Sequence, residues 1–228
     1  TAGSINTTYT SVNTTAGFSI SSYTGTGSNA TVGHGLGVAP SMMIVKQRNS
    51  TENWTVYHSS IGNPAQYIEL NSTGAVLTNS AVWNSTNPTS SVFSVGTNAR
   101  TNNNTSNYIA YCFAEKTGYS KFGSYVGNNN SDGTFVYTGF KPAFILMKST
   151  AANENWTIYD NKRASFNPST VRIYANLNNA ESSSTDLDLL SNGFKLRTTG
   201  GNSNDGTLIY MAFGQSIVGS NNIPATAR

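Results

Sequence analysis

Residues able to perform acid–base or nucleophilic chemistry are scarce in this sequence. It has ten Asp and Glu residues and two His residues. Only Glu52 and Glu154 recur in matching surroundings, each followed by Asn-Trp-Thr. A glycosidase needs two carboxylates flanking one bond, and these two belong to different copies of the repeat described below. A serine nucleophile needs a nearby base, and neither His34 nor His58 adjoins a nucleophile motif. The sequence therefore predicts a protein that is not an enzyme and has no cofactor.

Metal binding has only weak candidates. His34 stands between two glycines, a setting typical of a structural turn, although three copies could meet around the axis of a trimer and bind a metal. Asp186 and Asp188 lie on one side of an expected strand, and the loop 128–133 is rich in oxygen-bearing side chains. Either could hold calcium. We favour ordinary turn and edge residues at all three places, so no metal is predicted.

Aromatic residues are the strongest binding candidates. Sugar-binding sites commonly place a ring against an exposed aromatic face, which is apolar but has a polar edge. Core packing is the alternative, and it is favoured for the repeated rings because they neighbour Val56 and Ile158. Trp83 has no counterpart in the second copy and falls in a segment expected to be a polar loop, where recognition residues tend to lie. The candidate ligand-binding residues are Trp83, Trp54, Trp156, Tyr57 and Tyr159.

The composition indicates a β-sheet protein with many turns. Ser, Thr and Asn make up about two-fifths of the 228 residues, whereas charged residues are 10%. Thr, Tyr, Val and Ile favour strands, and Asn, Gly and Ser favour turns. The net charge of +3 is not clustered, which argues against nucleic-acid binding. No apolar stretch is long enough for a membrane-spanning helix. Cys112, the single cysteine, lies in an apolar run and is expected to be a buried, inert thiol.

The chain repeats itself. Ala39–Lys46 matches Lys141–Lys148, and Glu52–Tyr57 matches Glu154–Tyr159, both at an offset of 102 residues. Near the end of each copy, Tyr108–Ala114 matches Leu208–Gly214 at an offset of 100 residues. Blocks in the same order with nearly constant spacing indicate an internal duplication.

About seven strands are expected in the first copy. They lie near residues 17–24, 30–34, 41–48, 54–58, 66–71, 91–96 and 107–115. Short strands at regular spacing favour an all-β fold of two tandem, internally duplicated antiparallel β-sandwich (jelly-roll-like) units packed against each other; one shared sandwich is the alternative. The expected boundaries are residues 1–16 for an N-terminal arm or the end of an upstream module, 17–116 for repeat 1, 117–218 for repeat 2 and 219–228 for a C-terminal tail.

Five segments carry a family resemblance: Phe18–Gly25, Gly33–Pro40 (Gly-His-Gly-Leu-Gly-Val-Ala-Pro), Ile44–Lys46, Tyr108–Glu115 and Ser191–Arg197. With them, the chain from about residue 17 onward resembles a repeated β-rich domain found in tail-fibre and other structural proteins of tailed bacteriophages. This resemblance implies a place in the virion and no catalytic residues. The second copy departs from the pattern, because Val136–Phe140 replaces the Gly-His-Gly-Leu-Gly segment.

These observations together predict an extracellular virion appendage protein, such as a tail fibre, that contributes to host-surface recognition. Its expected partners are other virion proteins and a host cell-surface glycan. We expect a homo-oligomer, with a trimer favoured because fibres are commonly trimeric. A structural capsid decoration or head-fibre protein is one alternative, and a carbohydrate-binding module of a secreted protein is another.

Overall fold

The computed structural model describes residues 2–151, 153–163 and 166–214. Its elements are antiparallel β-strands with a few helical turns, so the predicted all-β class is confirmed. The chain divides into two compact units. Unit 1 is Thr1–Glu115 with Thr150–Asn153, and unit 2 is Lys116–Ser149 with Glu154–Arg228. None of the helices in the described part of the chain has the length and apolarity needed to cross a membrane.

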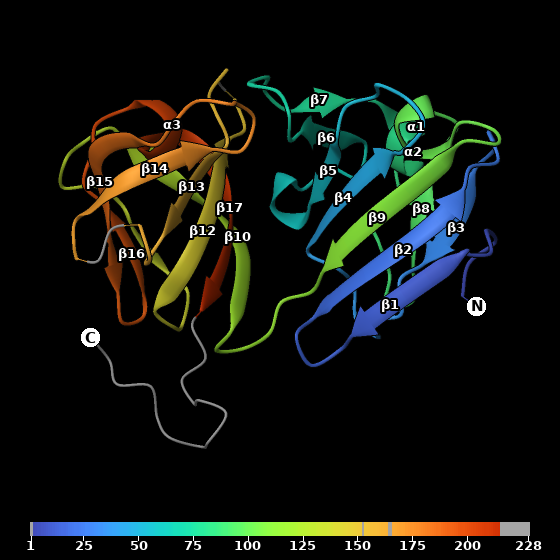
Figure 1. Ribbon diagram of the computed structural model, residues 1–228, viewed down its shortest axis with the longest axis horizontal. Helices are drawn as coiled ribbons and strands as arrows, with labels where there is room; N and C mark the ends of the chain where they lie inside the picture. The colour runs from blue at the N-terminus through green and yellow to red at the C-terminus, as the bar shows by residue number, and fades with distance from the viewer. Residues whose placement is uncertain (1, 152, 164–165, 215–228) are drawn as a thin grey trace. The chain divides into compact units, whose positions relative to one another are not determined.

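Unit 1 is built on a seven-stranded antiparallel sheet and a two-stranded ribbon. Neighbouring strands of the sheet, in order, are β1 (Tyr9–Asn13), β2 (Phe18–Thr24), β9 (Asn107–Phe113), β4 (Met42–Gln47), β5 (Thr55–His58), β6 (Gln66–Glu69) and β7 (Leu77–Thr78) (Figure 1). The ribbon pairs β3 (Ala30–Gly33) with β8 (Val92–Val95). Three short helical elements complete the unit: η1 (Ser59–Ile61), α1 (Ser80–Trp83) and α2 (Ala99–Asn102).

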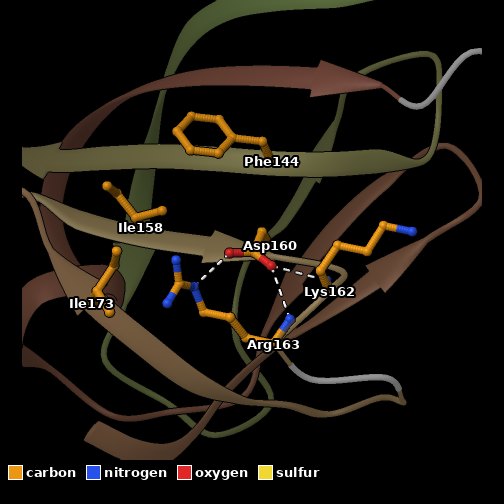
Figure 2. A pocket seen from close by; sticks show the side chains of 6 residues that line it. All are labelled: Phe144, Ile158, Asp160, Lys162, Arg163 and Ile173. Carbon is orange, nitrogen blue, oxygen red and sulfur yellow. Dashed lines mark hydrogen bonds and ion pairs between the residues drawn. The ribbon is translucent and has the colours of Figure 1, made fainter. Parts of the chain in front are cut away.

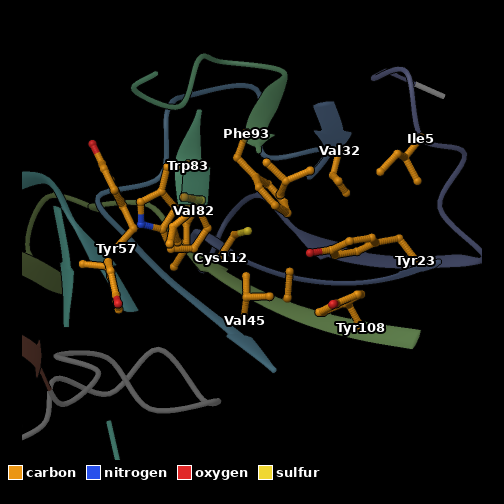
Figure 3. Packing of buried hydrophobic residues seen from close by; sticks show 14 of the residues in the cluster. Ile5, Tyr23, Val32, Val45, Tyr57, Val82, Trp83, Phe93, Tyr108 and Cys112 are labelled. Atoms are coloured by element: carbon orange, nitrogen blue, oxygen red, sulfur yellow. The ribbon is translucent and has the colours of Figure 1, made fainter. Parts of the chain in front are cut away.

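The core of unit 1 lies between the ribbon and the large sheet. Strand alternation sends Val32 and Phe93 inward from the ribbon, and both side chains are fully buried. Tyr23 stacks on Tyr108 within this core, with ring centroids 5.1 Å apart (Figure 3). Cys112 is also buried, as predicted, and burial raises the pKa of its thiol to about 12.

Unit 2 contains one eight-stranded antiparallel sheet that curls into a nearly closed, barrel-like form. In order, its strands are β10 (Ser120–Asn128), β17 (Asp205–Gly214), β12 (Pro142–Ser149), β13 (Thr157–Asp160), β14 (Ser169–Tyr174), β15 (Ser182–Leu190), β16 (Gly193–Leu196) and β11 (Phe135–Tyr137). The helical turn α3 (Gly201–Asn204) precedes β17. Unit 2 has its own cluster of buried apolar side chains, which includes Ile145, Phe194 and Leu208.

The strands of the two units pair in matching registers. In unit 1, Met43 pairs with Tyr57 on one side and with Cys112 on the other. In unit 2, Ile145 occupies the matching position, between Tyr159 and Ala212. Every residue from Met42 to Val45 is buried, as predicted for a strand covered on both faces.

A buried asparagine occupies the same position in each unit. The Asn102 side chain donates hydrogen bonds to the carbonyl oxygens of Gly96 (2.8 Å) and Ser28 (2.6 Å), and its Oδ1 accepts one from the main-chain N–H of Thr26 (2.7 Å). Asn204 likewise donates to the carbonyl oxygens of Thr198 (2.7 Å) and Asn130 (2.8 Å) and accepts from the N–H of Asn128 (3.2 Å). Both asparagines are fully buried. We call these two residues the asparagine clamps, because each ties an early turn of its unit to the loop before the last strand.

The N-terminal segment contributes to unit 1. Residues 9–13, inside the expected arm 1–16, form β1 and pair with β2 over five consecutive residues. Ile5 forms a parallel bridge with Val32 and is buried in the unit 1 core. The expected C-terminal tail, residues 219–228, lies outside the described residues.

Candidate functional site

Trp83 does not lie in a polar loop, so that part of the prediction is wrong. It is the last residue of α1, which begins after Asn79 caps the main-chain N–H of Ala81. Its side chain is only 1% exposed and packs edge-to-face on Tyr57, with ring centroids 6.1 Å apart (Figure 3). Trp83 is therefore a core residue of unit 1, and its ring presents no face to a ligand.

Three of the four repeated aromatic residues are buried in the cores, and the fourth, Trp54, is half-buried. Trp156 is 1% exposed, and Tyr57 and Tyr159 are buried. Trp54 is half-buried and stacks on Tyr111 at 6.4 Å. Matching asparagines hold the two tryptophans, because Asn71 accepts the main-chain N–H of Trp54 at 2.9 Å. Asn176 does the same for Trp156 at 2.9 Å.

The titratable candidates are engaged in structural contacts. His34 is fully buried, where Nδ1 accepts the main-chain N–H of Leu36 (3.2 Å) and Nε2 lies 3.1 Å from the carbonyl oxygen of Thr89. These two bonds fit the neutral imidazole with its proton on Nε2. Burial lowers the pKa of His34 below its usual value, and the bond to Thr89 opposes that shift.

Asp186 and Asp188 each face an arginine. The buried Asp186 carboxylate accepts hydrogen bonds from Tyr159 (2.7 Å), Arg172 (2.7 Å) and Ser184 (2.6 Å). Asp188 pairs with the Nε of Arg197 at 2.6 Å. Within residues 2–151, 153–163 and 166–214, no group of three or more His, Cys, Asp or Glu side chains could hold a metal ion. Through these hydrogen bonds the Asp186 carboxylate links its own strand, β15, to Tyr159 on β13 and Arg172 on β14.

Lysines at matching positions of the two units donate hydrogen bonds to main-chain carbonyl oxygens. Lys46 Nζ donates to the carbonyl oxygens of Gln47 (2.8 Å), Ser50 (2.9 Å) and Glu52 (2.7 Å). Lys148, which is fully buried, donates to the carbonyl oxygen of Ser149 at 2.9 Å. Burial lowers the pKa of Lys148 to about 8, and the charge of Glu154 opposes this shift. Lys46 thus anchors the loop that contains Glu52 through main-chain carbonyl oxygens.

A shallow groove crosses the outer side of β12, β13 and β14 in unit 2. Its floor is apolar and is formed by Phe144, Ile158 and Ile173, with Lys162 and Arg163 at the rim (Figure 2). At this rim Asp160 accepts the main-chain N–H groups of Lys162 and Arg163 (2.9 Å each) and pairs with the Arg163 Nε at 2.6 Å.

Arg163 also forms an ion pair with Glu181, so two carboxylates compensate its charge. Partial burial raises the pKa of Asp160, but the hydrogen bonds from Arg163 and Lys162 outweigh this, and the net pKa is below the ordinary value. Asp160 is therefore ionised at neutral pH. It can accept a hydrogen bond from a ligand in the groove but cannot donate a proton to it.

Two exposed aromatic side chains lie next to each other on β11. Strand alternation directs Val136 into the core, so Phe135 and Tyr137 both face outward. Phe135 is 43% exposed and Tyr137 is 63% exposed. We call these two residues the β11 strip. On the neighbouring strand β16 they face Lys195 and Gly193, respectively.

Polar groups surround the β11 strip. Lys195 pairs with Asp132 at 2.8 Å and donates to the carbonyl oxygen of Gly133 at 2.9 Å. The hydrogen bond and charge of Lys195 lower the pKa of Asp132, which keeps this exposed carboxylate ionised. Gly193 permits the close approach of β11, since a Cβ there would lie 2.1 Å from the carbonyl oxygen of Val136 and 3.1 Å from the Phe135 ring. The arrangement offers two apolar ring faces beside a carboxylate acceptor and an ammonium donor.

The matching strand of unit 1 has no such strip. Thr31 and Gly33 take the positions of Phe135 and Tyr137, and the N-terminal segment covers them. The main-chain N–H of Ile5 donates to the carbonyl oxygen of Thr31 at 2.9 Å. A Cβ on Gly33 would lie 2.3 Å from the carbonyl oxygen of Ala2, so a tyrosine in that position excludes this cover. The β11 strip is thus specific to unit 2, and our sequence analysis did not identify it.

A family model described as a domain of unknown function (DUF7483) matches residues 1–216. The chain belongs to this family. The matched range of DUF7483 begins with the N-terminal segment that covers β3 and includes the β11 strip, the groove and both asparagine clamps. A comparison with curated proteins and one with solved structures found no match.

Proposed function

We propose that this DUF7483 chain is a non-enzymatic module of a bacteriophage appendage, such as a tail fibre, and that it binds sugar chains on the host surface. In this proposal its two units are copies of one β-sandwich design, and only the second copy carries the β11 strip. The partners are other virion proteins and a host glycan, and the module works outside the cell.

Several features support this proposal. The chain resembles repeated domains of tailed-phage structural proteins, and His34, Asp186 and Lys46 are engaged in contacts that hold loops and strands together. Most of its polar residues are neutral hydroxyls and amides, which suit a surface that meets sugars by hydrogen bonding. A rigid β scaffold with a short recognition strand is also a common way to hold binding residues in place.

The β11 strip is the observation that carries the proposal. The two large aromatic side chains, 43% and 63% exposed, share one strand and form an apolar patch on a polar surface. A pyranose ring has one apolar face and a rim of hydroxyls. The rings of Phe135 and Tyr137 can accept the apolar face, and Asp132 and Lys195 can bond the hydroxyls.

The test is binding of the purified full chain to an array of bacterial surface polysaccharides. We expect saturable binding to at least one of them, and about a two- to tenfold loss of affinity in Tyr137→Ala, since an aromatic contact contributes about 0.5–1.5 kcal/mol. The matched control is Phe166→Ala, because Phe166 is another exposed aromatic residue of unit 2, at 86%. This variant should bind as the parent chain does.

The other outcomes distinguish the alternatives. Binding that survives the double variant Phe135→Ala, Tyr137→Ala but is lost in Phe144→Ala would retain sugar recognition and assign it to the groove of unit 2. The absence of binding to any sugar on the array would contradict sugar recognition. The structural role, in which the chain contacts only other proteins of the particle, would then be favoured.

A further inference from the structure

Strand β1 forms an open edge of the large sheet in unit 1. It pairs with β2 alone among the described residues, and all five of its residues are exposed. Tyr9 is 65% exposed and Val12 is 39% exposed. The pairing with β2 runs from Tyr9 to Asn13 without a bulge. The outer side of β1 therefore presents a regular row of main-chain hydrogen-bonding groups to a further strand.

The usual protections against edge pairing are missing from β1. Natural edge strands avoid association through charged side chains, prolines or bulges. The β1 sequence Tyr-Thr-Ser-Val-Asn has none of these, and residues 1–45 contain no Asp, Glu, Lys or Arg at all. The edge strand β10 of unit 2 differs, because it carries Lys121. Two copies can consequently bring their β1 edges together without any repulsion between charged residues in this part of the chain.

The middle of β1 sets the register of such a pair. Ser11 is the third of the five strand residues, so an antiparallel pair with its twofold axis at Ser11 lets all five residues of each copy pair. The opposed residues within the strand are Tyr9 with Asn13, Thr10 with Val12, and Ser11 with its own copy. None of these residues is charged.

We propose that two copies of this chain associate through β1, antiparallel, with Ser11 on the twofold axis. The large sheets of the two copies then become one continuous sheet. The contact is isologous, so it closes after two copies. One pair of five-residue strands buries little surface, and the dimer is accordingly weak and concentration-dependent. The inference concerns unit 1 only and does not rest on the proposed binding of sugars by unit 2.

Disulfide trapping of the full chain tests this geometry. Paired residues of antiparallel strands have Cα atoms about 4.5–5.5 Å apart, which is within the range that a disulfide spans. In Ser11→Cys, mild oxidation should yield a covalent dimer at least tenfold faster than in Asn29→Cys, an exposed control position on the loop before β3. The natural Cys112 gives no background, because it is buried and protonated.

Sedimentation provides a second measurement that needs no cross-link. The parent chain should show a monomer–dimer equilibrium, and Ser11→Lys should abolish the dimer because it places two like charges opposite each other. Ser11 is exposed, so the variant keeps its fold. Equal cross-linking at positions 11 and 29 would overturn the proposal. A trimer that Ser11→Lys leaves intact would also overturn it and would favour threefold fibre assembly.

Discussion

Replacing the asparagine clamp Asn102 with alanine should destabilise unit 1 by about 3–5 kcal/mol. The substitution removes the hydrogen bonds to the carbonyl oxygens of Gly96 and Ser28 and from the N–H of Thr26, together with longer bonds to the Thr26 hydroxyl. The bond to Gly96 is buried, and an unpaired buried group costs about 1–3 kcal/mol. The other two partners lie near the surface and regain water, so each costs about 1 kcal/mol.

Urea unfolding monitored by tryptophan fluorescence measures this loss, because Trp54 and Trp83 both belong to unit 1. The exposed neighbour Asn104 supplies the matched control, and Asn104→Ala should change the unfolding free energy by less than about 0.5 kcal/mol. Asn204→Ala should cause a loss of similar size, reported by Trp156 in unit 2. If Asn102→Ala unfolds within about 0.5 kcal/mol of the parent chain, the clamp does not hold the turns together and the reasoning fails.

Two further predictions concern buried rings of unit 1. Because burial lowers the pKa of His34, the unfolded chain binds more protons than the folded chain below about pH 6.5. The free energy of unfolding should therefore fall as the pH drops below that value. Denaturant titrations at pH 7 and pH 5 measure this loss, which should be smaller in His34→Gln than in the parent chain. Trp83→Ala should cost about 3–5 kcal/mol by leaving a cavity, without changing sugar binding. Trp83→Phe should cost less in the same denaturation assay, since the indole N–H has no hydrogen-bond partner within the described residues.

The strands with apolar runs could be predicted closely from the sequence. The expected strands 41–48, 54–58 and 107–115 correspond to β4, β5 and β9, within a residue or two at each end. Strand β1 was not predicted, because its Thr, Ser and Asn residues also suit a loop and, among the described residues, it pairs with β2 alone. Helix α1 has four residues, too few to produce a helical period. Asn79 as its cap was the one local signal of that helix.

The candidate site was harder to predict, because residue type does not determine exposure. Trp83 was chosen as a candidate because it has no counterpart in the second copy. A residue without a counterpart can equally fill core space that different side chains fill in the other unit. Unit 2 has the buried ion pair of Arg172 and Asp186 near Tyr159, whereas unit 1 has Trp83 against Tyr57. The alternation of side chains along a strand could have predicted the β11 strip. If Val136 points into the core, its neighbours Phe135 and Tyr137 must both point to the outer face.

The neutral character of the turn contacts has a consequence for the environments that this fold tolerates. Dissolved salt screens interactions between exposed charges but has little effect on hydrogen bonds between amides, hydroxyls and main-chain groups. The asparagine clamps and the Asn71 and Asn176 bonds to the two tryptophan segments are all of this neutral kind. The turns that these four asparagines hold should therefore keep their geometry from fresh water to brine.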